Sequence, residues 1–144
     1  GSTMRAEAQA YINRIDAALS LVRLALDWER ALRRLDELNA RVQDPKLWDN
    51  PKQAQAISRE QKTLETAVNT VNEIAAEMAD AIEFIEMGEA EGEESIVEDG
   101  LATLARLADR ADADKVQALL SGEADGNDTY LEIHAGAGGT ESQD

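Results

Sequence analysis

The amino-acid sequence predicts an all-α fold: three to four long antiparallel helices in a coiled-coil-like bundle, followed by one orphan β-strand and a glycine-rich loop. Two observations predict the helices. Apolar residues recur in alternating steps of three and four along most of the chain, which places them on one face of a helix. Aromatic residues make up only 3% of the sequence, so Ala, Leu, Ile and Val must build the core by packing helix against helix.

The charge balance limits the partners of this chain. Thirty Asp and Glu against fourteen Lys and Arg give a formal net charge of -16. A surface this acidic repels phosphate, so contact with nucleic acid would need a local basic patch or a partner protein. The absence of cysteine excludes disulfides and thiolate metal sites. No apolar run approaches the roughly 18 residues of a membrane span, so we expect no membrane contact.

Two helices are predicted before the first proline. Residues 1–3 are expected to be a cloning remnant ahead of Met4. An apolar stripe predicts a helix at about 5–26, and a second stripe, out of phase with the first, predicts another at 28–43. Asp27 lies at the change of phase and is expected to cap the second helix with its side chain.

A structured turn is predicted after these two helices. Residues 44–51 contain both prolines of the chain, and the residue before a proline disfavours helix. Asn50 is expected to cap the next helix, with Pro51 as the first helical residue. Leu47 and Trp48 are expected to fold back over the helix ends.

The longest helix is predicted at 51–87. Its apolar stripe has a single polar interruption, Gln61, and its members are Ala54, Ile57, Gln61, Leu64, Val68, Val71, Ala75, Met78, Ile82 and Ile85. At ~1.5 Å per residue such a helix is a rod of roughly 55 Å, which a small globular core cannot surround. We therefore expect long neighbours beside it, in a left-handed bundle set by the heptad period. Gly88 is expected to end this helix.

The last helix is predicted at 95–121, and Val116, Leu119 and Leu120 are expected to complete its apolar stripe. The stretch 86–99 carries seven acidic residues and no basic one. It could attract a basic partner or divalent cations, but a plain exposed connection is favoured. Ser95, with Glu98 three residues later, offers a capping box, although residues 91–94 could begin the helix earlier. Gly122 is expected to stop the helix.

The character of the sequence changes after the predicted bundle at 4–122. Residues 130–134 alternate in the manner of a strand, and 136–139 form a glycine-rich loop. A single strand has nothing to pair with, so 123–144 is expected to be the start of a truncated second domain.

No catalytic site emerges from the residues themselves. Residues 136–139 could form a phosphate-binding nest, but their spacing fits neither a P-loop nor a dinucleotide fingerprint, and a flexible connection is favoured. His134, the only histidine, has no nucleophile motif beside it, and a surface histidine is favoured. Glu73, Glu77 and Asp80 stack along the long helix, but a di-metal site needs Glu-x-x-His pairs that this sequence lacks, so a solvated face is favoured.

One basic concentration stands out. It consists of Arg23, Arg30, Arg33, Arg34 and Arg41. These arginines could contact RNA or an acidic partner, but pairing with Glu29, Asp36 and Glu37 is favoured. Trp28 and Trp48 could anchor an interface, and core packing is the favoured alternative.

Three stretches, in this order, resemble bacterial peptide chain release factor 2, a family of class I release factors. They are residues 44–51, 121–133 and 135–144. The last reads Ala-Gly-Ala-Gly-Gly-Thr-Glu-Ser-Gln-Asp and is the most specific. Release factor 1 has a similar glycine loop but usually follows it with Asp-Glu-Ala, so residues 140–144 indicate factor 2. The resemblance covers essentially the whole chain after the remnant.

The resemblance implies a part in translation termination. Class I release factors enter the ribosomal A site at a stop codon, and factor 2 reads UAA and UGA through a Ser-Pro-Phe loop. A Gly-Gly-Gln loop then promotes hydrolysis of peptidyl-tRNA. The N-terminal helical domain lies toward the stalk base of the large subunit and has been linked with the GTPase that recycles these factors.

This sequence contains neither loop, since Gly138-Gly139-Thr140 lacks the glutamine. The resemblance therefore implies a cytoplasmic, ribosome-docking module with no catalytic residue, cofactor, metal or small-molecule substrate of its own. Such a module meets the mRNA stop codon only through missing domains. The apolar stripes of the predicted helices, taken alone, also allow an alternative, which is an unrelated helical coiled-coil adaptor. A metal-dependent hydrolase is disfavoured by the shortage of ligands.

Overall fold

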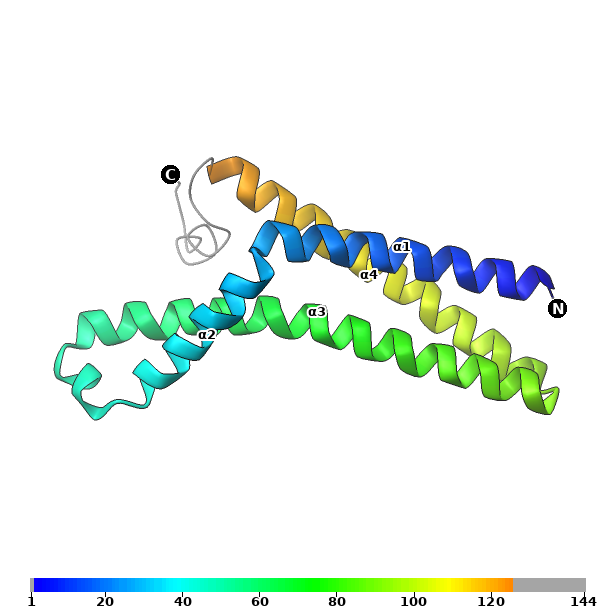
Figure 1. Cartoon of the computed structure of the whole chain (residues 1–144), viewed down its shortest axis with the longest axis horizontal. Helices are drawn as coiled ribbons and strands as arrows, with labels where there is room; N and C mark the ends of the chain where they lie inside the picture. Colours follow the sequence, from blue (N-terminus) through cyan, green and yellow to red (C-terminus); the bar gives the residue numbers. More distant parts are fainter. Residues whose placement is uncertain (1, 126–144) are drawn as a thin grey trace. The chain divides into compact units, whose positions relative to one another are not determined.

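The computed structural model describes residues 2–125, with side chains from Arg5 to Ser121. This part of the chain is all-α, as predicted, and has four helices (Figure 1): α1 (Ser2–Leu26), α2 (Trp28–Val42), α3 (Pro51–Glu91) and α4 (Glu94–Asp125). A 3-10 helix, η1 (Pro45–Asp49), precedes α3. The strand predicted at 130–134 lies outside the described residues.

The described helices divide into two compact units. Unit 1 consists of residues 2–22 and 71–117, and unit 2 consists of residues 23–70 and 118–125. The helix α3 contributes its first half to unit 2 and its second half to unit 1.

Unit 1 places α1, the second half of α3 and α4 side by side (Figure 1). Arg5 near the start of α1 pairs with Glu89 near the end of α3, whereas Arg14 further along α1 pairs with Asp112 of α4. Figure 1 shows α1 and α4 running in the same direction and α3 running against both. The predicted all-antiparallel arrangement is therefore wrong for α1 and α4, because three mutually adjacent helices cannot all be antiparallel to one another.

The core of unit 1 consists of small and medium aliphatic side chains, as the low aromatic content predicts. Its buried residues come from all three helices and are Ala8, Ile15, Ala18, Leu19, Val22, Val71, Ile74, Ala81, Ile85, Val97, Leu101, Leu104, Leu107, Ala108 and Ala111. The predicted stripe of α3 omitted Ile74 and Ala81. Because α1 and α4 both pack on α3 in this unit, the buried face of α3 is wider than one stripe. None of the described helices combines the length and the apolar character that a membrane span needs.

Two glycines let α3 and α4 approach each other closely. A Cβ on Gly88 would lie 2.8 Å from Cγ2 of Ile96, and a Cβ on Gly100 would overlap Cγ1 of Ile85. Gly88 is thus an interior position of α3, and its prediction as a helix stop is wrong. The backbone turns instead at Gly92, whose φ of 70° suits a residue without a Cβ.

The connection between α3 and α4 is much shorter than predicted. Only residues 92 and 93 separate the two helices, so most of the acidic stretch 86–99 is helical and not a connection. Because α4 begins at Glu94, Ser95 lies within the helix and does not cap it.

The helix α4 also ends later than predicted. It continues through Gly122 as far as Asp125. An interior glycine costs a helix only about 1 kcal/mol relative to alanine, so a single glycine does not by itself end a helix. Three apolar residues near this end, which were predicted to complete the buried stripe, are exposed: Val116, Leu119 and Leu120.

Unit 2 is built around a hairpin of α2 and the first half of α3, joined through η1. Leu38 is fully buried at its centre, and Leu47 of η1 is buried in the same cluster, as predicted. The side chain of Asn50 accepts a hydrogen bond from the backbone N–H of Gln53 at 3.3 Å, and Pro51 is the first residue of α3. The predicted cap of α3 is therefore confirmed.

Asp27 separates α1 from α2, as predicted, but not through its side chain. Its backbone is left-handed, with φ 55° and ψ 69°, and its side chain makes no capping hydrogen bond. The carboxylate lies 3.9 Å from the guanidinium of Arg30 instead. Asp is among the few residues that adopt this backbone conformation at low cost, which explains why the break falls here.

Candidate functional site

Arg34 is the most extensively paired member of the predicted basic cluster. Its Nε and Nη2 each donate at 2.8 Å to a carboxylate oxygen of Glu60, and its Nη1 donates at 3.0 Å to Glu37. The hydrogen bonds to Glu60 raise the pKa of Arg34. A two-pronged pair of this kind holds α2 against α3 in one geometry. The predicted pairing with Glu37 is confirmed, whereas Glu60, 26 residues away in the chain, is a partner that sequence spacing did not indicate.

The other arginines of α2 are less constrained. Arg33 and Arg41 are exposed and form no ion pair with any residue that the structure describes. The predicted pairing of the cluster with Glu29 and Asp36 is not found among the described residues. Two positive charges on the outer surface of α2 are therefore not neutralised within unit 2.

The two tryptophans of unit 2 differ in their surroundings. Trp28 packs against the core of the hairpin, as predicted, and the guanidinium of Arg23 lies 5.6 Å from the centre of its ring. Trp48 is 56% exposed, and its Nε1 donates to the backbone oxygen of Val42 at 3.4 Å. The prediction that Trp48 packs in the core is therefore wrong, because the short η1 turn buries Leu47 and leaves the next side chain outside.

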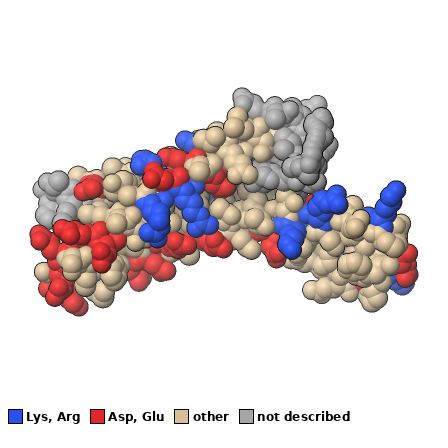
Figure 2. All heavy atoms as spheres, turned by 180° about the vertical axis from the view of Figure 1, so that it is seen from behind, with Lys and Arg blue, Asp and Glu red and all other residues tan. Residues whose placement is uncertain are grey.

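Charge is divided unequally between the units. Unit 2 carries nine basic and eight acidic residues in 23–70, and two more acidic residues, Glu123 and Asp125, in 118–125. The described part of unit 1 carries five basic and sixteen acidic residues. Figure 2 shows acidic side chains crowded around the α3–α4 turn of unit 1, and basic side chains standing on the surface of the unit 2 hairpin with few acidic ones beside them. The negative charge of the described residues thus lies mainly in unit 1, whereas residues 23–70 are close to neutral.

Three basic residues of α3 share the face of the helix opposite its core. Lys52, Arg59 and Lys62 lie at positions i, i+7 and i+10, and all three are exposed. Gln55 and Thr66 lie on the same face, and both are exposed as well. We call these five residues the α3 basic stripe. Within the described part of the chain, none of its three cations has an ion-pair partner.

The α3 basic stripe was not predicted from the sequence, in which the apolar stripe is the evident pattern of this part of α3. The basic residues are separated by seven and three positions, so they do not appear as a cluster in the linear sequence. The helical period would have placed them together.

Further along α3, in unit 1, the same face becomes acidic. Glu73 and Glu77 lie 2.9 and 3.5 Å from the guanidinium of Arg110 on α4, and Asp80 is exposed. Among the described residues there is no group of three or more His, Cys, Asp or Glu side chains that could hold a metal ion. His134 and residues 136–139 lie outside the described residues.

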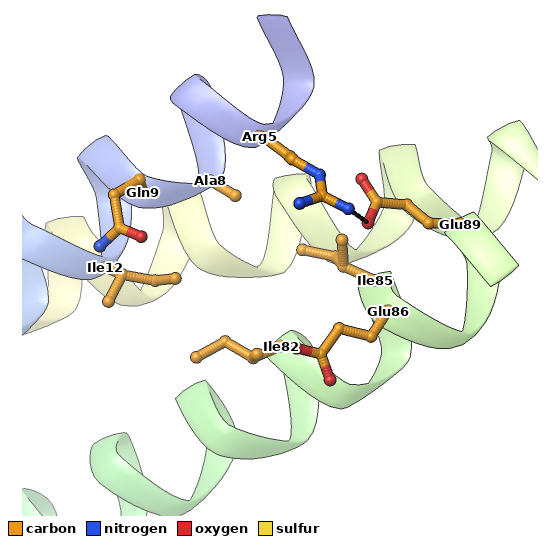
Figure 3. Close-up of a pocket in the computed structure, with 8 residues that line it drawn as sticks. All are labelled: Arg5, Ala8, Gln9, Ile12, Ile82, Ile85, Glu86 and Glu89. Carbon is orange, nitrogen blue, oxygen red and sulfur yellow. Dashed lines mark hydrogen bonds and ion pairs between the residues drawn. The ribbon is translucent and has the colours of Figure 1, made fainter. Parts of the chain in front are cut away.

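A hollow of about 240 Å³ lies between α1 and α3 in unit 1 (Figure 3). Ile12, Ile82 and Ile85 give it an apolar lining, and Arg5 and Glu89 meet across it at 3.4 Å. The residues that line it include no hydroxyl, thiol, imidazole or amine that could act as a nucleophile. Its carboxylates are those of Glu86 and Glu89, and Glu89 is paired with Arg5, so the hollow suits an apolar side chain.

Asp114 of α4 is the one described side chain with a buried polar atom that lacks a hydrogen-bond partner, its Oδ2. Burial raises the pKa of this carboxyl, and the nearby guanidinium of Arg110 opposes the shift. The group destabilises its unit when it is ionised, because its charge is only partly compensated.

With this geometry described, comparison with known proteins identifies the family. Residues 31–144 match the model of the PCRF domain family. The chain belongs to this family. The match confirms the resemblance to release factors that the sequence motifs indicated.

Curated relatives of this PCRF domain carry the name peptide chain release factor 2. The relative from Caulobacter sp. (strain K31) is 55% identical over 118 residues, which cover 82% of this chain and 32% of the relative. The relative from Roseobacter denitrificans is 50% identical over 141 residues, which cover 98% of this chain and 38% of the relative. The relative from Neorickettsia sennetsu is 36% identical over 138 residues. The chain thus spans about a third of the length of these relatives.

The matched part of the PCRF domain begins within α2. It contains the pairing of Arg34 with Glu60 and the whole α3 basic stripe. Both features of unit 2 therefore lie inside the segment that defines the family.

Proposed function

We propose that this PCRF domain is the N-terminal helical domain of a peptide chain release factor 2, which acts in the cytoplasm in translation termination at UAA and UGA codons. One observation carries the proposal: the family match over residues 31–144, with relatives named peptide chain release factor 2 over most of the chain. The motif at 135–144 supports factor 2 within the family.

In this proposal the domain contributes position and not chemistry. It has no catalytic residue, and the stop codon and the peptidyl-tRNA are met by parts of the factor outside this chain. Ion pairs that join different helices support this function. Arg14 joins α1 to α4, and Arg34 joins α2 to α3. Helices held in register by such pairs suit a docking arm.

The proposed partner is the ribosome, with docking at the stalk base of the large subunit, and the GTPase that recycles class I factors is a second partner. Surfaces of opposite charge suit this environment, because ribosomal proteins are basic and ribosomal RNA is acidic. The proposal includes no cofactor, no membrane and no small-molecule substrate.

A chimeric release factor tests the proposal. The 118 residues aligned with the Caulobacter sp. (strain K31) relative would replace the corresponding segment of that factor. Peptide release would then be measured on ribosomes stopped at UAA, UGA, UAG and a sense codon. We expect release at UAA and UGA within about tenfold of the parent factor, a difference of at most ~1.4 kcal/mol in activation free energy. We expect no release at the other codons.

Two controls make the result decisive. One factor lacks the segment, and another carries an unrelated helical hairpin of equal length. A chimera that unfolds cooperatively but releases no more peptide than these controls would contradict the proposal and favour a helical adaptor. Peptide release by the isolated 144-residue chain would contradict the docking function.

A further inference from the structure

The α3 basic stripe is the strongest charged feature that the helical packing leaves unexplained. Lys52, Arg59 and Lys62 point away from the core, and none of them meets a carboxylate in the described part of the chain. Glu60, the acidic residue nearest to Arg59 and Lys62 in the sequence, is already held by Arg34 through two hydrogen bonds of 2.8 Å. Asp49 and Glu65, each three positions from a lysine of the stripe, form no ion pair with it among the described residues. Within this part of the chain, the three charges are therefore available to bind an anion from outside.

The cations of the stripe lie in a segment, residues 23–70, that is close to neutral, although the whole chain is acidic. At physiological ionic strength charges are screened over about 8 Å, so a ligand at the stripe responds mainly to the charges nearest to it. Residues 23–70 carry nine basic and eight acidic residues, and the nine include the exposed Arg33 and Arg41 of α2. The overall charge of -16 does not describe this surface.

The composition of the stripe favours a nucleic acid over an acidic protein. A stable protein interface normally contains buried aromatic or large aliphatic anchors. Between the cations the stripe offers Gln55 and Thr66, which are hydrogen-bond donors of moderate size, and Ala56 and Thr63 at its margin. Phosphate groups need only cations and hydrogen-bond donors, which this face provides.

The spacing also suits a phosphate backbone. The helical rise separates Lys52 from Arg59 by ~10 Å and Arg59 from Lys62 by ~4.5 Å. The three cations thus extend over ~15 Å. Phosphates in one strand of a DNA duplex follow one another every ~3.4 Å along its axis, so a length of ~15 Å spans about four phosphates of such a strand.

We propose that the α3 basic stripe binds the phosphate backbone of RNA through Lys52, Arg59 and Lys62, with Gln55 and Thr66 as neutral donors. The binding is electrostatic and independent of base sequence. This inference rests on the proposed function for its choice of RNA, since a ribosome offers RNA backbone as its main anionic surface. It assigns the RNA contact to the first half of α3 and leaves the acidic surface of unit 1 for protein partners.

Fluorescence anisotropy of a labelled 24-nucleotide RNA hairpin, titrated with the 144-residue chain at 50 to 200 mM NaCl, tests the proposal. With three phosphate contacts, the logarithm of the association constant should fall with the logarithm of the salt concentration at a slope of about -2 to -3. The variant K52Q/R59Q/K62Q should bind at least about tenfold more weakly at 50 mM salt. Each single variant should reduce the slope by about one.

A variant of equal net charge provides the control. Ala17→Glu, Ser20→Glu and Ala76→Glu add three negative charges at exposed positions of unit 1. This variant should retain the salt slope of the parent chain, and thermal unfolding should show that both variants are folded. If the stripe variant does not fold, the three single variants replace it.

Several results would overturn the inference. In the first, the parent chain does not bind the labelled RNA at 50 mM salt. In the second, RNA binding is weakened equally in the stripe variant and the control variant. In the third, polyglutamate displaces the labelled RNA as effectively as unlabelled RNA does. The last result would assign the stripe to an acidic protein. The peptide-release assay of the chimera does not depend on this titration. A chain that does not bind RNA but supports peptide release in the chimera would refute RNA binding by the stripe and leave the proposed function intact.

Discussion

Replacement of Gly100 by alanine tests how closely α3 and α4 pack in unit 1. Two effects oppose each other. Alanine favours a helix over glycine by about 1 kcal/mol. However, a Cβ at this position would overlap Cγ1 of Ile85 and lie 3.1 Å from its Cδ1. Ile85 is buried and β-branched, so it has one preferred rotamer in a helix and cannot turn aside cheaply.

Overpacking of this kind costs about 1–3 kcal/mol, which exceeds the helical gain. We therefore expect Gly100→Ala to destabilise the chain by about 1 kcal/mol and to lower its melting temperature by about 3–5 °C. Thermal and urea unfolding followed by circular dichroism measure both quantities. Ala76→Gly, at an exposed position of α3, measures the helical term alone.

A double-mutant cycle identifies the cause. Ile85→Ala removes both atoms that the new Cβ would meet, so Gly100→Ala should become neutral or stabilising in that background, with a coupling of about 2 kcal/mol. A gain in stability from Gly100→Ala while Ile85 is present would refute this account of the helix contact.

Two further predictions concern charged groups. Arg34→Lys keeps the charge but loses the bidentate hydrogen bond with Glu60, so we expect the free energy of unfolding in urea to fall by about 0.5–1.5 kcal/mol. The control Arg33→Lys, on the same helix, should lower it by no more than about 0.5 kcal/mol. Equal losses in the two variants would contradict the pairing. Because burial raises the pKa of Asp114, the folded chain binds this proton more tightly than the unfolded chain, and its contribution to stability falls as pH rises from the ordinary carboxyl range through the raised pKa. Asp114→Asn should therefore raise the melting temperature at pH 7, and the gain should vanish below about pH 4; a gain that is constant over this range would exclude a titrating carboxyl.

Part of the candidate site could be predicted from sequence because it depends on local spacing. Glu37 lies one helical turn from Arg34, so their pairing follows from the period of the helix. Glu60 could not be assigned, because its contact with Arg34 depends on how α2 folds back onto α3. The α3 basic stripe could be predicted only in part. The helical period places its members on one face of the helix, but only the position of the core shows that this face is exposed.

The sequence by itself determined the all-α class, the four helices of the described range, the break at Asp27, the cap of α3 at Asn50 and the family. These depend on residues close together in the chain or on a motif that is read directly. Tertiary structure alone decided that Gly88 lies inside a helix and that Trp48 is exposed. The reason is physical. A glycine ends a helix or allows a close contact according to what packs against it, and a large side chain is buried only if another helix covers it.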